Sequence, residues 1–294
     1  MVYSMTGYGS GECTRYNRIL TVEIKSVNHR YLDVSARLPR ALSGLEERVR
    51  RRVAAAASRG KIDVYVSFDS FSDDDCAVTL NEPLADACAA ALISLKGRYP
   101  ELKDDLSLSL LAGRADIVTV EKQAGGDADE IWGALSGALE NALTAFARMR
   151  GTEGANLAED ILRKRDTLIY LCQRVADRAP LVAADYAERL RRKVSEALAG
   201  AEYDEARLIA EVTIFADKSC VDEELTRLKS HLLQLKDILE GGGAVGKKLD
   251  FLTQEINREV NTIGSKSNDL DITRAVVEMK SELEKIREQV QNIE

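Results

Sequence analysis

The stretch RILTVEIK, residues 18–25, decides the fold of the first part of the chain. Its apolar residues Leu20, Val22 and Ile24 occupy alternate positions, and polar residues stand between them. A period of two is typical of a β-strand that buries one face and leaves the other in water. The stretch therefore predicts one strand of a half-buried sheet.

Further strands of the same kind follow from the neighbouring sequence. Residues 32–38 and 62–68 repeat the alternation of apolar and polar positions. Asn17 suits a tight hairpin turn, which makes residues 11–16 the partner strand of residues 18–25. We therefore expect a small antiparallel sheet of four strands.

One helix and a change of period complete the predicted layout. Ser43 is placed to cap a helix that runs to about residue 58, with Leu45, Val49 and Val53 facing the sheet. Beyond the sheet the apolar residues follow the helical period almost throughout. We expect an α+β fold in three parts: residues 1–71 with the sheet and one helix, 72–200 as a helical middle region, and 201–294 as a helical C-terminal region.

Glycine and proline predict where these helices break, and two late helices carry heptad stripes. The expected breaks lie at residues 97–100, 125–127, 151, 180, 200 and 241–243. The two stripes step by four and three, and consist of Val221, Leu225, Leu228, Leu232, Leu235 and Leu239, and of Ile272, Val276, Met279, Leu283, Ile286, Val290 and Ile293. Packing within the chain explains the first stripe, whereas a contact between subunits is an alternative for the second.

The composition excludes several classes of protein. Hydrophobic residues make up 45% of the chain and charged residues 31%, as in soluble proteins that build a core without disulfides. The five cysteines contain no C-x-x-C pair, so a cysteine metal cluster is not expected. The chain shows no signal-peptide pattern and no apolar run of membrane-spanning length, so we expect a cytoplasmic protein without a membrane partner.

The charge is unevenly distributed along the chain. The net charge is −8, yet residues 1–70 contain 12 Lys and Arg against 7 Asp and Glu. This asymmetry suggests a basic module attached to an acidic helical one, and a basic module suits an acidic partner such as nucleic acid. Solubility alone would also explain the acidic part.

Two glycine-rich strings resemble nucleotide-binding motifs without matching them. In GGGAVGKK, residues 241–248, Lys248 stands where a P-loop has Ser or Thr, and a helix precedes the loop, so no nucleotide cofactor is expected. Lys247 and Lys248 at the start of the next helix nevertheless suit phosphate contacts. The string GYGSG, residues 7–11, opens a strand, so its glycines indicate an unusual backbone path or a close approach of another chain segment.

The string SVNHRY, residues 26–31, lies between two predicted strands and gathers polar and aromatic side chains. Arg and Asn contact phosphates or base edges, and Tyr stacks on bases, so Asn28, His29, Arg30 and Tyr31 are candidate RNA contacts. Lys61 enters the next strand and adds a possible phosphate contact. A capped turn is the other interpretation of this string, and the spacing alone favours neither.

The helix that begins near residue 247 has an unusual polar face. Opposite its apolar stripe of Leu249, Leu252, Ile256, Val260 and Ile263 lie Asp250, Gln254, Asn257 and Asn261, flanked by Glu255, Arg258 and Glu259. Asn and Asp are mediocre helix formers, and amides and carboxylates in register suit a metal–water or phosphate site. In the preceding helix Glu224 and His231 are two turns apart, about 10 Å, and border one face. A solvated helix face is the alternative in both cases.

Several strings occur in the order found in one known family. They are SMTGYG, VEIKSVNHRYLD, RGK, EELTRLKSH, GKKLDFLTQEINREVNTIGSK and KIREQVQNIE, and together they make the chain resemble the YicC/YloC family. The resemblance implies a bacterial endoribonuclease that acts on single-stranded or structured RNA with Mn²⁺ or Mg²⁺. It also implies a homo-oligomer, with a hexamer expected, that encloses the RNA. Cys220 departs from the family pattern, because relatives commonly have Asp there.

These observations lead to one main hypothesis, metal-dependent cleavage of RNA phosphodiester bonds. The metal-binding and catalytic carboxylates would be Glu224, Asp250, Glu255 and Glu259. His231 would orient water or protonate the leaving oxygen. The phosphate-binding residues would be Arg30, Lys61, Lys247, Lys248, Arg258 and Lys266. The competing hypotheses are an RNA-binding adaptor without chemistry of its own and a purely structural helical scaffold.

Overall fold

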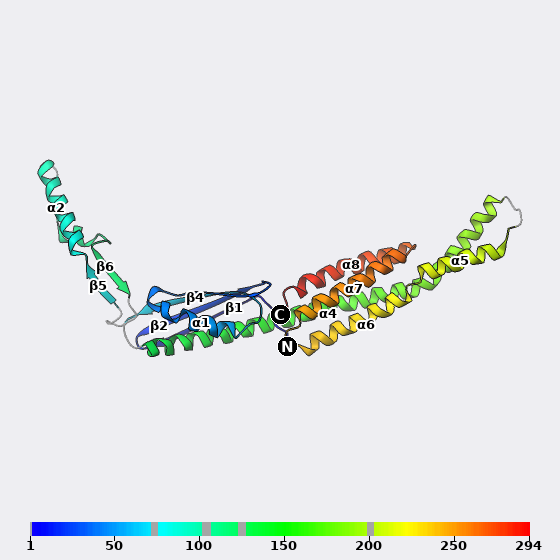
Figure 1. Ribbon diagram of the computed structural model, residues 1–294, viewed down its shortest axis with the longest axis horizontal. Helices are drawn as coiled ribbons and strands as arrows, with labels where there is room; N and C mark the ends of the chain where they lie inside the picture. Colours follow the sequence, from blue (N-terminus) through cyan, green and yellow to red (C-terminus); the bar gives the residue numbers. More distant parts are fainter. Residues whose placement is uncertain (1, 72–75, 102–106, 123–127, 199–202) are drawn as a thin grey trace.

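A computed structural model describes residues 2–71, 76–101, 107–122, 128–198 and 203–294, and shows an elongated, bowed molecule (Figure 1). Helix α4 (Ala128–Ala197, 70 residues) runs along most of it. The sheet lies against the first half of α4, and two late helices, α6 (Asp222–Gly241) and α8 (Leu270–Val290), lie against the second half, with a third, α7 (Gly246–Lys266), packed on both of them. The two ends of the described chain meet near the middle, where Ser4 forms a β-bridge with Ile293.

The sheet contains β1 (Gly7–Arg15), β2 (Arg18–Val27), β3 (Leu32–Arg37) and β4 (Gly60–Ser70), in the order β1-β2-β4-β3. The predicted hairpin is confirmed: Tyr16 and Asn17 both have φ of 55°, as a two-residue turn of type I′ requires. The β1–β2 and β2–β4 pairs are antiparallel, but β3 pairs with β4 in parallel. The expected antiparallel sheet is therefore mixed, because a helical crossover connects β3 to β4.

The predicted inner face of the sheet is confirmed. Leu20, Val22 and Ile24 are fully buried. They pack in one core with α1 (Glu46–Ala54), which contributes Val49 and Val53. The same core contains residues 131–146 of α4, so the sheet unit predicted for residues 1–71 is completed by a helix far along the chain. The α+β fold class is confirmed.

The expected start of the sheet helix is wrong. A 3₁₀ helix, η1 (Arg40–Leu45), precedes α1, and Ser43 lies within it instead of capping the helix. Leu45 occupies the N-cap position without a side-chain hydrogen bond to the helix. The apolar period is correct even so, because Leu42 inside η1 is also buried and extends the stripe.

Glycines let β1 lie directly on the backbone of α4. A Cβ atom on Gly9 would be 2.2 Å from the Ala142 carbonyl oxygen, and one on Gly11 would be 2.3 Å from that of Ala138. Real Cβ atoms do not approach so closely, so only glycine fits at both positions. The expected close approach at residues 7–11 is therefore confirmed.

The C-terminal half is a bundle of α4 with α6, α7 and α8. Both heptad stripes and the apolar stripe of α7 are buried in one core within the single chain. The stripe of α8 packs in that core, so the alternative that it forms a subunit contact is wrong.

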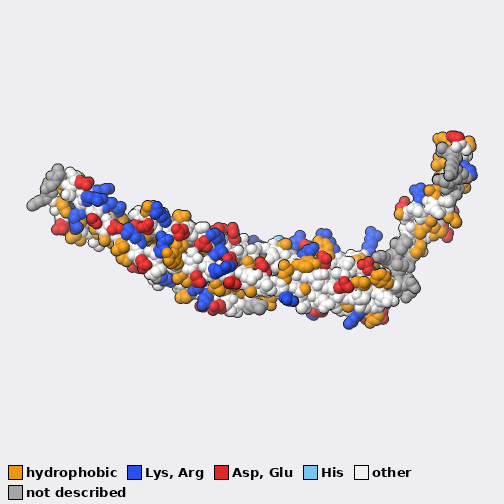
Figure 2. Space-filling view, turned by 180° about the vertical axis from the view of Figure 1, so that it is seen from behind, with side chains coloured by type: hydrophobic (Ala, Val, Ile, Leu, Met, Phe, Trp, Pro, Cys, Tyr) orange, Lys and Arg blue, Asp and Glu red, His pale blue; other side chains and the backbone are white. Residues whose placement is uncertain are grey.

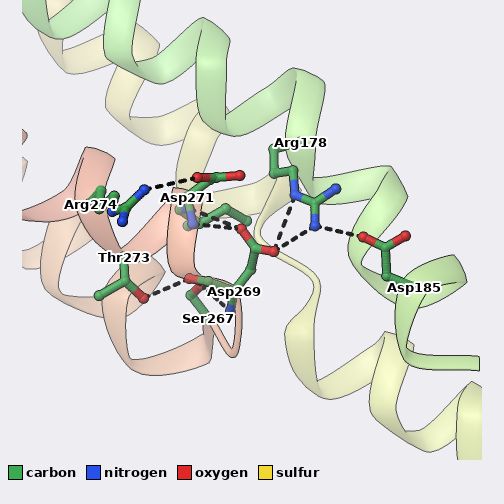
Figure 3. Close-up of polar contacts among 8 residues, drawn as sticks. Arg178, Asp185, Ser267, Asp269, Asp271, Thr273 and Arg274 are labelled. Atoms are coloured by element: carbon green, nitrogen blue, oxygen red, sulfur yellow. Dashed lines mark hydrogen bonds and ion pairs between the residues drawn. The ribbon is translucent and has the colours of Figure 1, made fainter. Parts of the chain in front are cut away.

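Two of the expected helix breaks do not occur, because α4 continues through Gly151 and Pro180. Just before the proline, Arg178 Nη2 donates to Asp185 Oδ2 (2.6 Å) and to Asp269 Oδ2 (2.7 Å) (Figure 3). Asp269 also caps α8, since its Oδ1 accepts the amides of Asp271 and Ile272. The Arg178–Asp185 ion pair thus spans Pro180, which lacks an N–H donor, within α4, and the Arg178–Asp269 ion pair fastens the helix to the start of α8.

The other expected breaks have mixed outcomes. Helix α2 (Glu82–Arg98) and helix α6 end where the glycines near 97 and 241 predict. The breaks at residues 125–127 and 200 lie outside the described residues.

Smaller elements project at the two ends of the molecule (Figure 1). At one end, β5 (Cys76–Leu80) and β6 (Val118–Lys122) pair in antiparallel next to α2 and α3 (Leu108–Ala112). At the other end lies α5 (Glu205–Ser219). The middle region was expected to be helical, and the short β5–β6 ribbon is the exception. No described helix is both long and apolar enough to cross a membrane.

Candidate functional site

Segments that are far apart in the sequence meet where the sheet joins the helical bundle. The Arg59 Nε donates to the carbonyl oxygen of Arg30 at 3.3 Å. Its Nη1 is 3.6 Å from the position of a Cβ on Gly246, at the first turn of α7. The loop after β2, the start of β4 and the start of α7 therefore share one place, which we call the basic junction: Arg30, Arg59, Lys61, Lys247 and Lys248.

The loop of residues 28–31 divides into two pairs of residues. Asn28 Nδ2 donates to the carbonyl oxygen of Gln291 at 2.7 Å, so this side chain fastens the loop to the end of the chain. His29 Nδ1 lies 3.0 Å from the carbonyl oxygen of Tyr31 and completes a turn. For these two residues the structure supports the capped turn. Arg30 and Tyr31 are exposed, with the Arg30 guanidinium 5.4 Å from the centre of the Tyr31 ring.

The start of α7 adds both side-chain charge and backbone donors to the basic junction. Its N-cap residue, Val245, makes no side-chain hydrogen bond to the first turn. The first amides of a helix carry a partial positive charge and attract anions. Lys247 and Lys248 are exposed beside them. Lys61 is exposed at the start of β4 and pairs with Val27 at the end of β2.

The far end of α7 meets the start of α6 through buried carboxylates. Glu224 and Glu259 are 6% and 5% exposed. Lys266 Nζ donates to Glu224 Oε1 at 2.7 Å, and this hydrogen bond raises the pKa of the Lys266 ammonium. Arg227 Nη1 lies 3.9 Å from Glu259 Oε1. Glu224 Oε2 is buried and has no hydrogen-bond partner among the described residues.

The four candidate carboxylates do not form one cluster. Asp250 and Glu259 are nine residues apart on α7, about 900° of rotation, so they lie on opposite sides of the helix. Asp250 Oδ2 instead accepts a hydrogen bond from Gln254 on the outer face, at 3.2 Å. Within the described ranges, no three His, Cys, Asp or Glu side chains are arranged to hold a metal ion. Glu224, Asp250, Glu255 and Glu259 as a set therefore do not fit a single ion, and Glu224 alone offers an unpaired buried oxygen.

Cys220 precedes Glu224 in the chain, just before α6, and His231 follows it within α6. His231 is half-buried, and its Nδ1 is buried without a hydrogen-bond partner in the part of the chain that the structure describes. Exposed Cys220 lies just before α6, with its Sγ 3.7 Å from Asp222 Oδ2. The carboxylate of Asp222, which the sequence did not single out, thus lies beside Cys220, the position at which the family resemblance implies Asp.

The outer face of α7 carries a shallow depression of about 430 Å³. Its lining is polar and consists of Gln254, Asn257, Arg258, Asn261, Thr262 and Ser265. The predicted amide-rich face is therefore exposed and hollowed, and Thr262 and Ser265 extend it. Arg258 belongs to this face, whereas Lys266 is bound to Glu224. On the face of the molecule in Figure 2, basic and acidic side chains are interspersed along its length and do not form one large patch of either sign.

Comparison with known proteins covers nearly the whole chain. The family model "Endoribonuclease YicC-like, N-terminal region" matches residues 2–159, and "Endoribonuclease YicC-like, C-terminal" matches residues 175–294. A protein of Clostridioides difficile named probable endoribonuclease YicC is 44% identical over 295 residues, and one of Haemophilus influenzae with the same name is 35% identical over 294 residues. Each alignment covers 100% of both chains. The chain therefore belongs to the YicC-like endoribonuclease family.

Proposed function

We propose that this protein is an endoribonuclease that binds RNA at the basic junction and along the outer face of α7. The observation that carries the proposal is the meeting of Arg30, Arg59 and Gly246 from three distant segments, which brings the neighbouring Lys247 to the same place. An exposed face rich in amides begins about two turns further along α7, at Gln254, and continues to Ser265. From Gly246 to Lys266 this helix extends about 30 Å, a length that a single strand of several nucleotides can follow.

Cleavage is assigned to the end of α7 that meets α6. Glu224 is buried with one oxygen unpaired, an arrangement that is costly unless a ligand or a proton partner uses it. His231 lies two turns further along α6, about 10 Å from Glu224, and we assign to it the donation of a proton to the leaving oxygen. Lys266 holds the other oxygen of Glu224 and fixes its orientation.

A requirement for Mn²⁺ or Mg²⁺ is part of the proposal. Its support in the molecule is Glu224 Oε2, since a carboxylate oxygen is a ligand that both ions accept. A bound ion would supply positive charge that lowers the pKa of its water and stabilises the charge of the phosphate. Asp250 belongs with the RNA-binding face of α7 in this proposal, not with the ion.

One experiment separates the enzyme from the alternative, an RNA-binding adaptor. The adaptor is favoured by one observation, the neutralisation of Glu224 by Lys266. Purified protein is incubated with an end-labelled RNA, with Mn²⁺, with Mg²⁺ or with EDTA. We expect cleavage with an ion, none in EDTA, and binding in all three conditions. Binding without cleavage in every condition would establish the adaptor instead.

The assembly of several copies, with six expected from the family resemblance, belongs to the same proposal. Exposed apolar side chains on the projecting α5, among them Ile209 and Ile214, are available for contacts between copies. The native mass in solution tests this, and a monomer at micromolar concentration would contradict it.

A further inference from the structure

The sheet has a second face that the bundle and α1 do not cover. Gly7, Gly9 and Gly11 of β1 point toward α4, so the alternation of the strand turns Tyr8 to the opposite face. Tyr8 is 40% exposed and Tyr65 on β4 is 36% exposed. Two tyrosine rings therefore lie on an open sheet surface, where burial in a core does not explain them.

These rings belong to a row that crosses all four strands. Tyr8 on β1 is paired in register with Lys25 on β2, and Tyr65 on β4 is paired with Arg37 on β3. The Lys25 Nζ lies 5.7 Å from the centre of the Tyr8 ring and 5.8 Å from that of the Tyr65 ring. The Arg37 guanidinium lies 5.3 Å from the Tyr65 ring. In the order β1-β2-β4-β3 the row reads ring, cation, ring, cation.

This alternation matches the chemistry of an unpaired nucleic-acid strand. Bases stack on exposed aromatic faces, and cations between the rings meet phosphates or stack themselves. The two rings are two strands and two residues apart, about 12 Å, which leaves room for a base on each. The carboxylates Glu23 and Asp63 lie on the same face, and Glu23 is 3.6 Å from Lys25. They oppose a continuous phosphate backbone, so stacking must carry most of the affinity.

The row is also continuous with the basic junction. Lys61 lies on the same face of β4 as Tyr65, because the two are four residues apart in one strand. At about 3.3 Å per residue they are separated by about 13 Å. A strand that leaves the basic junction at Lys61 therefore reaches Tyr65 within a few nucleotides.

We propose that the open face of the sheet is a stacking platform for unpaired bases of single-stranded RNA, formed by Tyr8, Lys25, Tyr65 and Arg37. This inference rests on the proposed function only in taking RNA as the ligand. It assigns to the N-terminal region the selection of unpaired RNA, and leaves cleavage to the place where the start of α6 meets the end of α7. The platform excludes a duplex, whose bases are stacked on one another and cannot reach the rings.

The test compares a double variant, Tyr8→Ala with Tyr65→Ala, with the corresponding double Phe variant. The control is Tyr170→Ala, which removes an exposed tyrosine from α4. Fluorescence anisotropy measures the affinity for a labelled single-stranded oligoribonucleotide and for its duplex at several salt concentrations, and gels verify that the RNA is intact. Circular dichroism confirms that each variant is folded.

We expect the Ala pair to weaken single-strand binding at least about tenfold, with an unchanged salt slope and little change for the duplex. The Phe pair and Tyr170→Ala should bind like the wild type, because both variants keep the fold and an aromatic ring at positions 8 and 65. Normal single-strand binding by the Ala pair, or equal loss for both RNAs, would overturn the platform. A changed native mass without a change in binding would make this face a contact between copies.

The outcome is independent of the cleavage proposal. If the wild-type protein binds single-stranded RNA through these tyrosines but never cleaves it, the platform stands and the enzyme does not. If cleavage proceeds normally in the Ala pair and binding is unaffected, the platform is wrong and the enzyme stands.

Discussion

Replacing Gly9 by Ala should strongly destabilise the contact between β1 and α4. The added Cβ would lie 2.2 Å from the carbonyl oxygen of Ala142, 2.5 Å from the amide nitrogen of Phe146 and 2.7 Å from the Phe146 Cβ. Ordinary contacts begin near 3.4 Å, so strand and helix must separate by about 1 Å. Two of the three obstacles are backbone atoms, which cannot move aside as a flexible side chain does.

The expected cost follows from this geometry. Overpacking a core costs typically 1–3 kcal/mol, and an obstacle made of backbone belongs at the upper end, about 3 kcal/mol. Gly9 has no positive φ, so the penalty is steric and not conformational. The separation would also loosen the packing of Phe146, a fully buried ring of the sheet core.

The matched control is Gly133→Ala, in α4, the helix on which β1 packs. Nothing lies within 4 Å of a Cβ at this position. A Gly-to-Ala change inside a helix stabilises it by about 0.5–1 kcal/mol. Urea denaturation followed by circular dichroism gives the free energy of unfolding of each variant. A Gly9→Ala protein within about 0.5 kcal/mol of the wild type would refute the packing described here.

Three further predictions concern cleavage, RNA affinity and acid stability. Glu224→Gln should lower the cleavage rate at least about tenfold, or about 1.4 kcal/mol of barrier, while RNA affinity measured in EDTA stays normal; full activity would remove this carboxylate from the site. Charge reversal at Arg30 and Lys61 should weaken RNA binding for all sequences and lower the salt slope by about 1.4, and an unchanged slope would exclude the basic junction. The hydrogen bonds from Arg178 lower the pKa of the Asp269 carboxyl, so its stabilisation is present above the unfolded pKa of about 3.9 and is lost as the pH falls through the lower folded value. Asp269→Asn should therefore cost about 1 kcal/mol at pH 7 and nothing near pH 2, and an equal cost at both values would contradict the ion pair.

Local periodicity made much of the fold predictable from the sequence. Alternation identified the buried face of β2, and the heptad steps identified the buried stripes of α6 and α8, because each pattern repeats within one element. The parallel pairing of β3 was not predictable in this way, since it depends on which distant strand lies alongside. The continuation of α4 through Pro180 was not predictable for a similar reason, since the ion pair from Arg178 to Asp269 depends on a segment that is distant in the sequence.

The candidate site was predicted less well than the fold. Four residues of the basic junction, Arg30, Lys61, Lys247 and Lys248, were identified one string at a time, but their meeting depends on Gly246 lying close to Arg59. The separation of Asp250 from Glu259 follows from 100° per residue, and applying that rule would have divided the carboxylate set. The row from Tyr8 to Arg37 was missed, because it exists only in the spatial order of the strands.

Helix α4 has a consequence for how this protein can be divided. The two family models leave residues 160–174 between them, yet these residues are continuous helix. A cut in that interval would leave the part of α4 that packs in the sheet core in one polypeptide. It would leave later residues of α4, which pack in the bundle core, in the other. Each fragment would contain one part of the apolar surface of α4, which is a single continuous helix in the intact chain. Helix α4 thus connects the sheet to the bundle without a linker, and a change in the angle between them requires α4 itself to bend.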